Sequence, residues 1–127
     1  MDDSKLTLTA LLQLKERRER KIRSEITRLE KELAANEQMR EELLQIRQDL
    51  WHQWRQCGDE EKLLDPLEWR AYRVELARYY QYDHDLMTQL EAARTQSQML
   101  EIQKDAQQQL LRQSMMEQEK LKIMMEE

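Results

Sequence analysis

The chain has 127 residues, of which 37% are charged and 6% aromatic, and it contains one glycine, one proline, one cysteine and no phenylalanine. This composition excludes a globular domain with a large core, and the regularly spaced leucines exclude a disordered chain. A high charge content with periodic apolar residues is typical of long helices and coiled coils. We therefore expect an all-α protein that forms a single unit over residues 1–127.

The charge and apolar content disfavour two kinds of partner. The formal net charge of −5 argues against nucleic-acid binding. No apolar run approaches the ~18 residues that cross a bilayer, so direct membrane insertion is not expected. The N-terminus lacks a basic lead into an apolar stretch, which predicts no cleavable export signal. A single cysteine fits a reducing compartment. We expect a cytoplasmic protein.

Residues with catalytic or ligating chemistry form no recognisable motif. The sequence has no glycine-rich phosphate loop, no nucleophile motif and no distinct carboxylate pair. Two histidines, His52 and His84, and Cys57 lack the spacing of metal ligands. We expect no catalytic residue, no metal site and no cofactor, and we do not expect an enzyme.

The only glycine and the only proline delimit a predicted turn at residues 58–65. Gly58 can enter the left-handed region without a Cβ penalty, so it is expected just beyond the C-cap of a first helix. That helix is predicted over about 5–57, and a second helix over about 66–125. Two long helices joined by one short turn predict an antiparallel two-helix coiled-coil hairpin.

Residues at the end of this turn carry several helix-start signals. Asp65 offers a side-chain acceptor to free amides, and Pro66 fits the first helical position. Glu68 lies where a capping box has a carboxylate, and Leu64 with Trp69 has the spacing of a hydrophobic staple. The second helix is therefore predicted to begin at Pro66.

The first helix carries a coiled-coil stripe with alternating spacings of four and three. Its members are Ile22, Ile26, Leu29, Leu33 and Asn36. The next apolar residues are Met39, Leu43, Ile46, Leu50 and Trp54. This second set is out of phase with the first, which predicts a local disturbance of the supercoil.

The second helix has apolar residues on two heptad positions, with several polar layers. The first position contains Trp69, Leu76, Asp83, Leu90, Ser97, Lys104, Leu111, Gln118 and Met125. The second contains Tyr72, Tyr79, Leu86, Ala93, Leu100, Gln107, Ser114 and Leu121. Residues 96–109 are rich in glutamine, so we expect that part to fray or to require a partner.

Pairing the two heptad patterns gives an approximate register for the hairpin. Residue i is expected opposite roughly residue 123 minus i, so that Leu33 meets Leu90 and Leu43 meets residues 76–80. Both chain termini then lie at one end, where apolar residues cover more than one helical face. They are Leu6, Leu8, Leu11, Leu12 and Leu14 near the start, with Met115, Met116, Leu121, Ile123, Met124 and Met125 near the end.

A basic segment follows the apolar start of the chain. Residues 15–31 contain eight Lys or Arg and four Glu. Two pairs, Glu16 with Arg20 and Glu19 with Arg23, have the favourable i,i+4 order. The segment is consistent either with a solvated charged face or with a docking surface.

The aromatic residues gather toward the predicted turn. Helical spacing places four of them mostly inward, namely Trp54, Trp69, Tyr72 and Tyr79. It places three of them away from the seam, namely Trp51, Tyr80 and Tyr82. Exposed aromatic residues concentrate binding energy, so these three are candidates for contact with another protein.

Several of these motifs resemble the FliJ, YscO and HrpO family, the central stalk proteins of flagellar and virulence-associated type III secretion. They are the Leu-Leu-x-Leu-Lys-Glu run at residues 11–16, the Trp51-x-x-Trp54-Arg55 step, the glycine turn and Trp69-Arg70-x-Tyr72. The resemblance implies an antiparallel two-helix coiled coil. It also implies three partners: a hexameric secretion ATPase, an export-gate membrane protein and secretion chaperones.

The resemblance and the residue pattern together give two sets of candidate contact residues. The export-gate or chaperone set is Trp51, Trp54, Tyr72, Tyr79, Tyr80 and Tyr82. The ATPase-ring set is Leu8, Leu11, Leu12, Lys15, Arg17, Arg18, Met115, Met116 and Leu121. Glu75 stands where we would look for a further aromatic contact, which is a departure from the family pattern.

These observations lead to one main hypothesis and two alternatives. The end with the termini is expected to enter the ATPase ring and the aromatic end to face the export gate, with the protein a monomer at the inner-membrane export apparatus. The first alternative is a coiled-coil scaffold or tether that forms a homo-oligomeric bundle. The second is an arm that binds structured RNA through residues 15–31, although the interleaved glutamates disfavour it.

Overall fold

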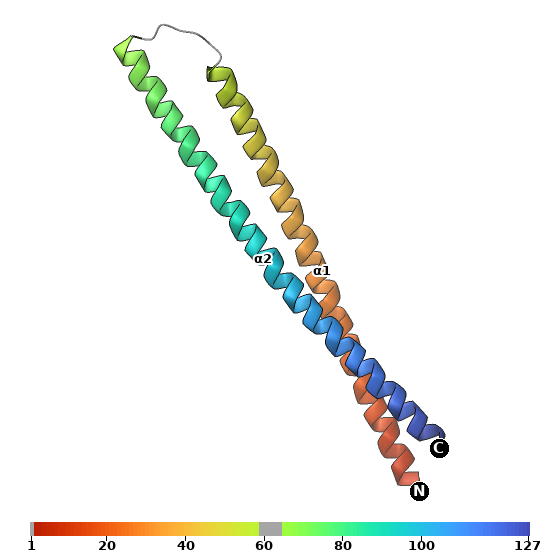
Figure 1. The fold of residues 1–127 in the computed structure, drawn as a ribbon. Helices are drawn as coiled ribbons and strands as arrows, with labels where there is room; N and C mark the ends of the chain where they lie inside the picture. Colours follow the sequence, from red (N-terminus) through yellow and green to blue (C-terminus); the bar gives the residue numbers. More distant parts are fainter. Residues whose placement is uncertain (1, 59–64) are drawn as a thin grey trace. The chain divides into compact units, whose positions relative to one another are not determined.

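The computed structural model describes residues 2–58 and 65–127, and the side chains of 3–56 and 65–127. They form two helices, α1 at Asp2–Gly58 and α2 at Pro66–Glu126 (Figure 1), and no strand. The two helices pair as an antiparallel two-helix hairpin, which confirms the predicted all-α fold class. The observed helices extend a few residues beyond the predicted ranges of 5–57 and 66–125.

The start of α2 is a capping box, as the sequence predicts. The Glu68 backbone N–H donates to the Asp65 carboxylate at 2.7 Å, and the Asp65 N–H donates to the Glu68 carboxylate at 3.4 Å. The first backbone hydrogen bond of the helix runs from the Trp69 N–H to the Asp65 carbonyl at 2.9 Å. Pro66 occupies the first helical position, where its missing N–H costs no hydrogen bond.

The end of α1 differs from the prediction by one residue. Gly58 is the last residue of α1, and the prediction that the helix stops at Cys57 is therefore wrong. Glycine weakens a helix interior through its backbone entropy. It costs less in the final turn, whose carbonyls have no intrahelical partner in any case. The predicted staple cannot be placed because Leu64 lies outside the described residues.

The chain divides into two compact units, each with one segment of α1 and one of α2. The terminal unit comprises Met1–Ala34 and Gln98–Glu127, and the central unit comprises Ala35–Ser97. Each unit has its own seam between the two antiparallel segments, because each segment alone has only a narrow apolar stripe.

The seam of the terminal unit joins the first part of α1 to the last part of α2. Leu29 and Leu100 are fully buried in it. Gln118 is also buried and donates through Nε2 to the Lys15 carbonyl at 3.4 Å and to the Ser114 hydroxyl at 3.3 Å. Both chain termini belong to this unit (Figure 1), as the sequence predicts.

The seam of the central unit has an apolar part and a polar layer. Leu50, Leu86 and Ala93 are buried. Asn36, at 9% exposure, donates through Nδ2 to the Ala93 carbonyl at 2.8 Å and to the Ser97 hydroxyl at 2.6 Å. No buried side-chain nitrogen or oxygen among the described residues lacks a hydrogen-bond partner.

The heptad pattern predicted for α2 is confirmed along most of the helix. From Tyr72 to Met125, every residue of the two predicted heptad positions is buried or half-buried. Trp69 is the exception, since its side chain is 50% exposed. The predicted weakness of residues 96–109 is not seen, because α2 is helical throughout and Leu100 is buried.

The change of phase predicted for α1 is wrong. Met39 and Ile46 are 45% and 41% exposed, whereas Leu43, Arg47 and Leu50 continue the spacing set by Asn36. The spacing also extends backward, because Leu8, Leu12, Lys15 and Glu19 are all half-buried. Apolar residues beside the seam misled the prediction, since charged side chains occupy seam positions where the facing helix supplies a partner.

The predicted register is also wrong. Residue 36 lies against residues 93 and 97 rather than 87, and residue 47 lies against 83 rather than 76. In the terminal unit, residue 15 lies against 117 rather than 108. The displacement is about one heptad, and a seven-residue slip leaves the same heptad positions in the seam. The polar partners therefore distinguish the two registers.

We predict that replacing the polar layer by apolar residues loosens the register without lowering stability. In an Asn36→Leu/Ser97→Ala variant both hydrogen-bond partners become apolar, a change that is often neutral or stabilising. A slip of one heptad displaces positions 48 and 95 along the helix axis by about 10 Å. Nitroxide labels at these positions, in a Cys57→Ala background, should give one distance for the native pair and at least two for the variant. A single unchanged distance would contradict this role of Asn36.

Candidate functional site

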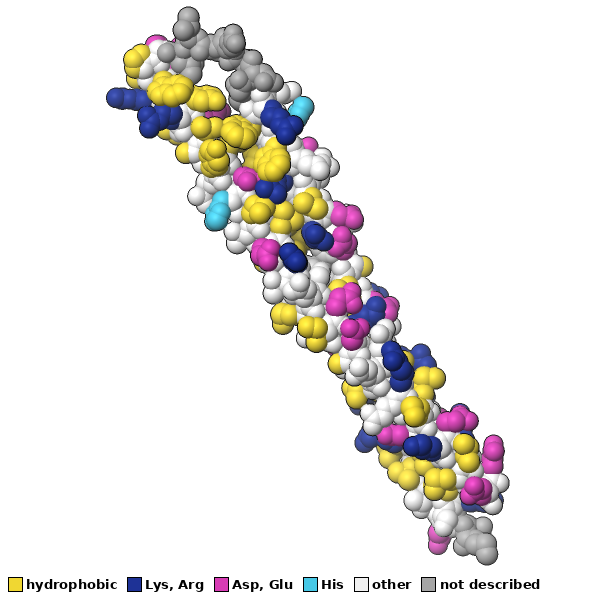
Figure 2. Space-filling model, in the orientation of Figure 1, with side chains coloured by type: hydrophobic (Ala, Val, Ile, Leu, Met, Phe, Trp, Pro, Cys, Tyr) yellow, Lys and Arg dark blue, Asp and Glu magenta, His cyan; other side chains and the backbone are white. Residues whose placement is uncertain are grey.

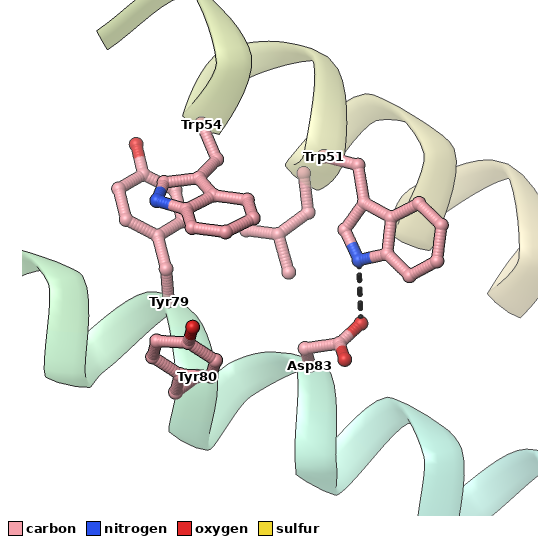
Figure 3. A pocket seen from close by; sticks show the side chains of 6 residues that line it. Trp51, Trp54, Tyr79, Tyr80 and Asp83 are labelled. Atoms are coloured by element: carbon pink, nitrogen blue, oxygen red, sulfur yellow. Dashed lines mark hydrogen bonds between the residues drawn. The ribbon is translucent and has the colours of Figure 1, made fainter. Parts of the chain in front are cut away.

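The central unit carries an aromatic cluster formed by Trp51, Trp54, Tyr79 and Tyr80. Trp54 from α1 and Tyr80 from α2 make an edge-to-face contact, with ring centroids 5.8 Å apart and planes at 63°. Figure 3 shows the α1 indoles and the α2 phenols directed toward the space between the two helices. A pocket of about 280 Å³ opens there, lined by the cluster with Leu50 and Asp83.

Asp83 connects the cluster to the seam. Its Oδ1 accepts hydrogen bonds from Arg47 Nε at 2.8 Å and from Trp51 Nε1 at 2.9 Å (Figure 3). The Arg47 guanidinium carbon lies 4.3 Å from the Trp51 ring centroid, which is a cation–π contact. The hydrogen bond from Arg47, and then that from Trp51, hold the pKa of Asp83 below its usual value.

The predicted orientations of the aromatic residues are mostly confirmed. Trp51, Tyr80 and Tyr82 are exposed, at 40%, 62% and 49%, whereas Tyr72 and Tyr79 are half-buried. Trp69 is wrong as an inward residue. It stacks on Tyr72 instead, with ring centroids 5.9 Å apart and planes at 25°.

Trp54 lies at the edge of the seam, with 37% of its side chain exposed. The structure brings Trp51, Trp54, Tyr79 and Tyr80 together, with Trp69 and Tyr72 as a separate stacked pair. Large apolar side chains gather visibly over this part of the central unit in Figure 2.

A groove beside the cluster was not predicted from the sequence. It follows the outer side of α2 over about four turns and includes Arg47 of α1 at its edge. Its lining residues on α2 are Tyr80, Asp83, His84, Met87, Thr88, Glu91, Ala92, Thr95 and Gln96. The three- and four-residue spacing of Tyr80, His84 and Met87 was the available signal, but mixed polarity concealed it.

In the terminal unit, the predicted ring-contact residues divide between surface and seam. Five are exposed: Leu11, Arg17, Arg18, Met115 and Met116. Four are half-buried: Leu8, Leu12, Lys15 and Leu121. The exposed apolar residues of this unit also include Leu6 at 67%, Leu14 at 50%, Ile123 at 51% and Met124 at 54%. The terminal contact surface is defined as Leu6, Leu11, Leu14, Met115 and Met116.

Lys15 is part of the seam and not a free surface cation. Its Nζ forms an ion pair with Glu117 of α2, and this contact lowers the pKa of the Glu117 carboxyl. A groove of about 440 Å³ lies beside the pair, lined also by Arg18, Ile22 and Leu110. Lys15 therefore serves the pairing of α1 with α2, and the nearby exposed cations are better placed for a partner.

The basic segment of α1 contains both paired and unpaired cations. Arg28 is bound by Glu25 and Glu32, which raises the pKa of Arg28 and lowers the pKa of Glu25. Arg23 lies 3.7 Å from Glu19, as the i,i+4 pattern predicts. Arg23 also donates to the Met115 sulfur at 3.8 Å.

The unpaired cations are Arg17, Arg20 and Lys21, for which no ion pair is present within residues 2–58 and 65–127. All three are exposed. Arg20 and Lys21 were not among the predicted contact residues. The predicted pair of Glu16 with Arg20 does not form, so Arg20 remains free to meet an anionic group.

Metal and membrane sites were searched over the described part of the chain. No group of three or more His, Cys, Asp or Glu side chains there could hold a metal ion. Neither α1 nor α2 contains a stretch long and apolar enough to cross a bilayer within the described residues.

Comparisons with known proteins give no relative on which to base a function. No protein-family model, no curated protein and no solved structure matches the chain.

We predict that the Asp83 contacts contribute stability that depends on pH. The carboxyl pKa is lowered in the folded state, so the contribution is complete above the unfolded value near 4 and is lost as the pH falls through the folded pKa. Asp83→Asn should lower the free energy of unfolding by about 1 kcal/mol at pH 7. The difference from the native chain should shrink below about pH 4.

Thermal unfolding followed by circular dichroism at several pH values measures this difference. Asp85→Asn is the matched control, because the Asp85 carboxylate accepts only from Gln81 of the same helix at 2.9 Å. A difference between Asp83→Asn and the native chain that stays constant down to pH 2 would contradict the prediction.

Proposed function

We propose that the chain is a non-enzymatic central stalk protein of a type III secretion apparatus. It binds the hexameric secretion ATPase and couples it to the membrane export gate and to chaperones. The proposal rests on the resemblance of residues 11–16, 51–55 and 69–72 to the FliJ, YscO and HrpO family. The antiparallel two-helix hairpin is the fold which that resemblance implies. The protein would act in the cytoplasm, peripherally associated with the inner-membrane export apparatus.

The observation that carries the proposal is the terminal contact surface. Leu6 and Met116 expose 67% and 62% of their side chains, and Leu11, Leu14 and Met115 expose 41% to 50%. None of them is needed in the seam, and grouped exposed apolar residues mark contact surfaces. They lie on both α1 and α2, so a ring that surrounds the unit would cover more of them than a single flat partner.

Charge on α1 supports the same contact. Arg17, Arg20 and Lys21 are exposed without ion pairs in the described chain, close in sequence to Leu11 and Leu14. Unpaired cations beside an apolar surface favour a partner with acidic groups around an apolar lining. Methionines and leucines with shallow contacts also suit a shaft that must favour one ring arrangement without permanent binding.

The aromatic cluster supports contact with the export gate or with chaperones. Tyr80 and Trp51 are exposed beside a pocket, and tyrosine and tryptophan are the residues that most often dominate binding energy at interfaces. The groove along α2 continues this surface as far as Gln96. We assign the gate or chaperone contact to the central unit and the ATPase contact to the terminal unit.

We predict that a Leu11→Asp/Met115→Asp/Met116→Asp variant loses binding to the secretion ATPase while remaining helical. All three side chains lie outside the seam, so the hairpin should survive. Burying even one unpaired carboxylate in an apolar interface should weaken binding by about tenfold or more. Met39→Asp/Ile46→Asp is the matched control, because these residues are similarly exposed but lie in the central unit. Equal binding by the triple variant would refute the assigned contact.

The cations provide a second arm of the same experiment. Arg17→Ala/Arg20→Ala/Lys21→Ala should weaken ATPase binding by about tenfold at low salt, with little effect at high salt. Arg28→Ala is the matched control, because Glu25 and Glu32 already bind Arg28. If Arg28→Ala had the larger effect, charge complementarity at the unpaired cations would be excluded.

The second candidate function is a homo-oligomeric coiled-coil scaffold, and the same exposed apolar residues favour it. Two copies could bury their terminal contact surfaces against each other in a four-helix bundle. A stalk that fills the single pore of a hexamer should instead be monomeric. Light scattering over a range of protein concentrations should therefore give the mass of one chain. A stable mass of two or more chains would support the scaffold.

A further inference from the structure

Trp51 is exposed but held at two places. Its Nε1–H donates to Asp83 Oδ1 at 2.9 Å, and the Arg47 guanidinium covers the ring at 4.3 Å from the centroid. The holding groups are more buried than the indole, since the Arg47 and Asp83 side chains are 23% and 27% exposed and Trp51 is 40% exposed. The ring is therefore fixed from the seam side, while part of it remains open to a partner.

Such fixing matters for binding because ordering a side chain at an interface reduces affinity. The cost of immobilising one flexible side chain corresponds to about threefold to tenfold in the dissociation constant. A tryptophan that is already ordered avoids that cost. Arg47 alone cannot supply the order, because the guanidinium that covers the ring is itself held by Asp83 through Nε at 2.8 Å.

We propose that Asp83 is a positioning residue for the partner-binding surface of the central unit: it holds the Trp51 indole against Arg47, so that the partner meets a fixed ring. The proposal rests on the proposed function, which assigns the gate or chaperone contact to this unit. Asp83 acts through Trp51, because its carboxylate oxygen is occupied by two donors within the chain.

The arrangement also defines the chemistry of the group that meets Trp51. The indole N–H is already donated within the chain, so the ring offers carbon atoms and a π face but no hydrogen-bond donor. Trp51, Trp54 and Tyr80 border the same pocket of about 280 Å³. An apolar side chain of the partner fits this pocket better than a polar one, since a polar group would lose water without gaining a donor from Trp51.

The position of Trp51 can be measured without any partner. The chain has three tryptophans, so Trp54→Phe/Trp69→Phe leaves Trp51 as the only indole. In this background, Asp83→Ala should increase acrylamide quenching of Trp51 fluorescence and lower its anisotropy. Asp85→Ala should change neither, because Asp85 accepts from Gln81 of its own helix. Helix content measured by circular dichroism shows that both variants are folded.

Binding is measured with the native tryptophans and the purified cytoplasmic domain of the export-gate protein from the same organism. Asp83→Ala should weaken binding by about threefold to tenfold. In a Trp51→Ala background the same change should have an effect within about twofold of none, since the two residues act as one unit. A folded but less stable variant would instead lose affinity equally in both backgrounds.

The outcomes separate this proposal from the proposed function. Unchanged quenching of Trp51 in folded Asp83→Ala would overturn the positioning role, whatever binds the chain. Released fluorescence with unweakened binding would overturn it as well. Failure of the native chain to bind the gate domain would count against the proposed function, and the quenching result would still decide whether Asp83 holds Trp51.

Discussion

The hydrogen bonds of Asn36 are the constraint on which the pairing of α1 with α2 in the central unit depends. An apolar heptad seam tolerates a slip of seven residues, because leucines then still face leucines. A buried amide does not tolerate it, since Asn36 would lose both the Ala93 carbonyl and the Ser97 hydroxyl. The terminal unit has comparable polar contacts, from Lys15 to Glu117 and from Gln118 to the Lys15 carbonyl. Polar groups inside each seam therefore select the register that apolar burial leaves open.

The same division explains what could be predicted from the sequence. Local rules were sufficient for the capping box at Asp65 and Glu68 and for the heptad positions of α2, because each depends on residues within one helix. The phase of α1 and the register failed, because Arg47 lies in the seam only when Asp83 faces it. The contact surfaces were half predictable. Exposed Leu11 and Met116 follow from position, whereas the pairing of Lys15 and the freedom of Arg20 depend on which carboxylates lie near them.

Excess apolar surface distinguishes this hairpin from one that only satisfies its own seam. Leu6, Leu11, Met115 and Met116 lie outside the heptad positions of the terminal unit, and Trp51 and Tyr80 lie beside those of the central unit. Each such residue costs solubility and adds nothing to the pairing of the helices. Their concentration in two regions with different chemistry favours two different partners. The terminal surface is aliphatic with unpaired cations nearby, and the central one is aromatic with its charges paired.

Asp83 shows how the seam and a contact surface can depend on one carboxylate. A charge at a seam position weakens an apolar seam unless it is paired, and Arg47 supplies that pair. Because Oδ1 also accepts from Trp51, the ion pair that stabilises the central unit orders an exposed indole at the same time. An apolar pair at these two positions could stabilise the seam equally well, but it would leave Trp51 without an acceptor. Retaining charge in the seam is therefore explained better by the surface that it organises than by stability alone.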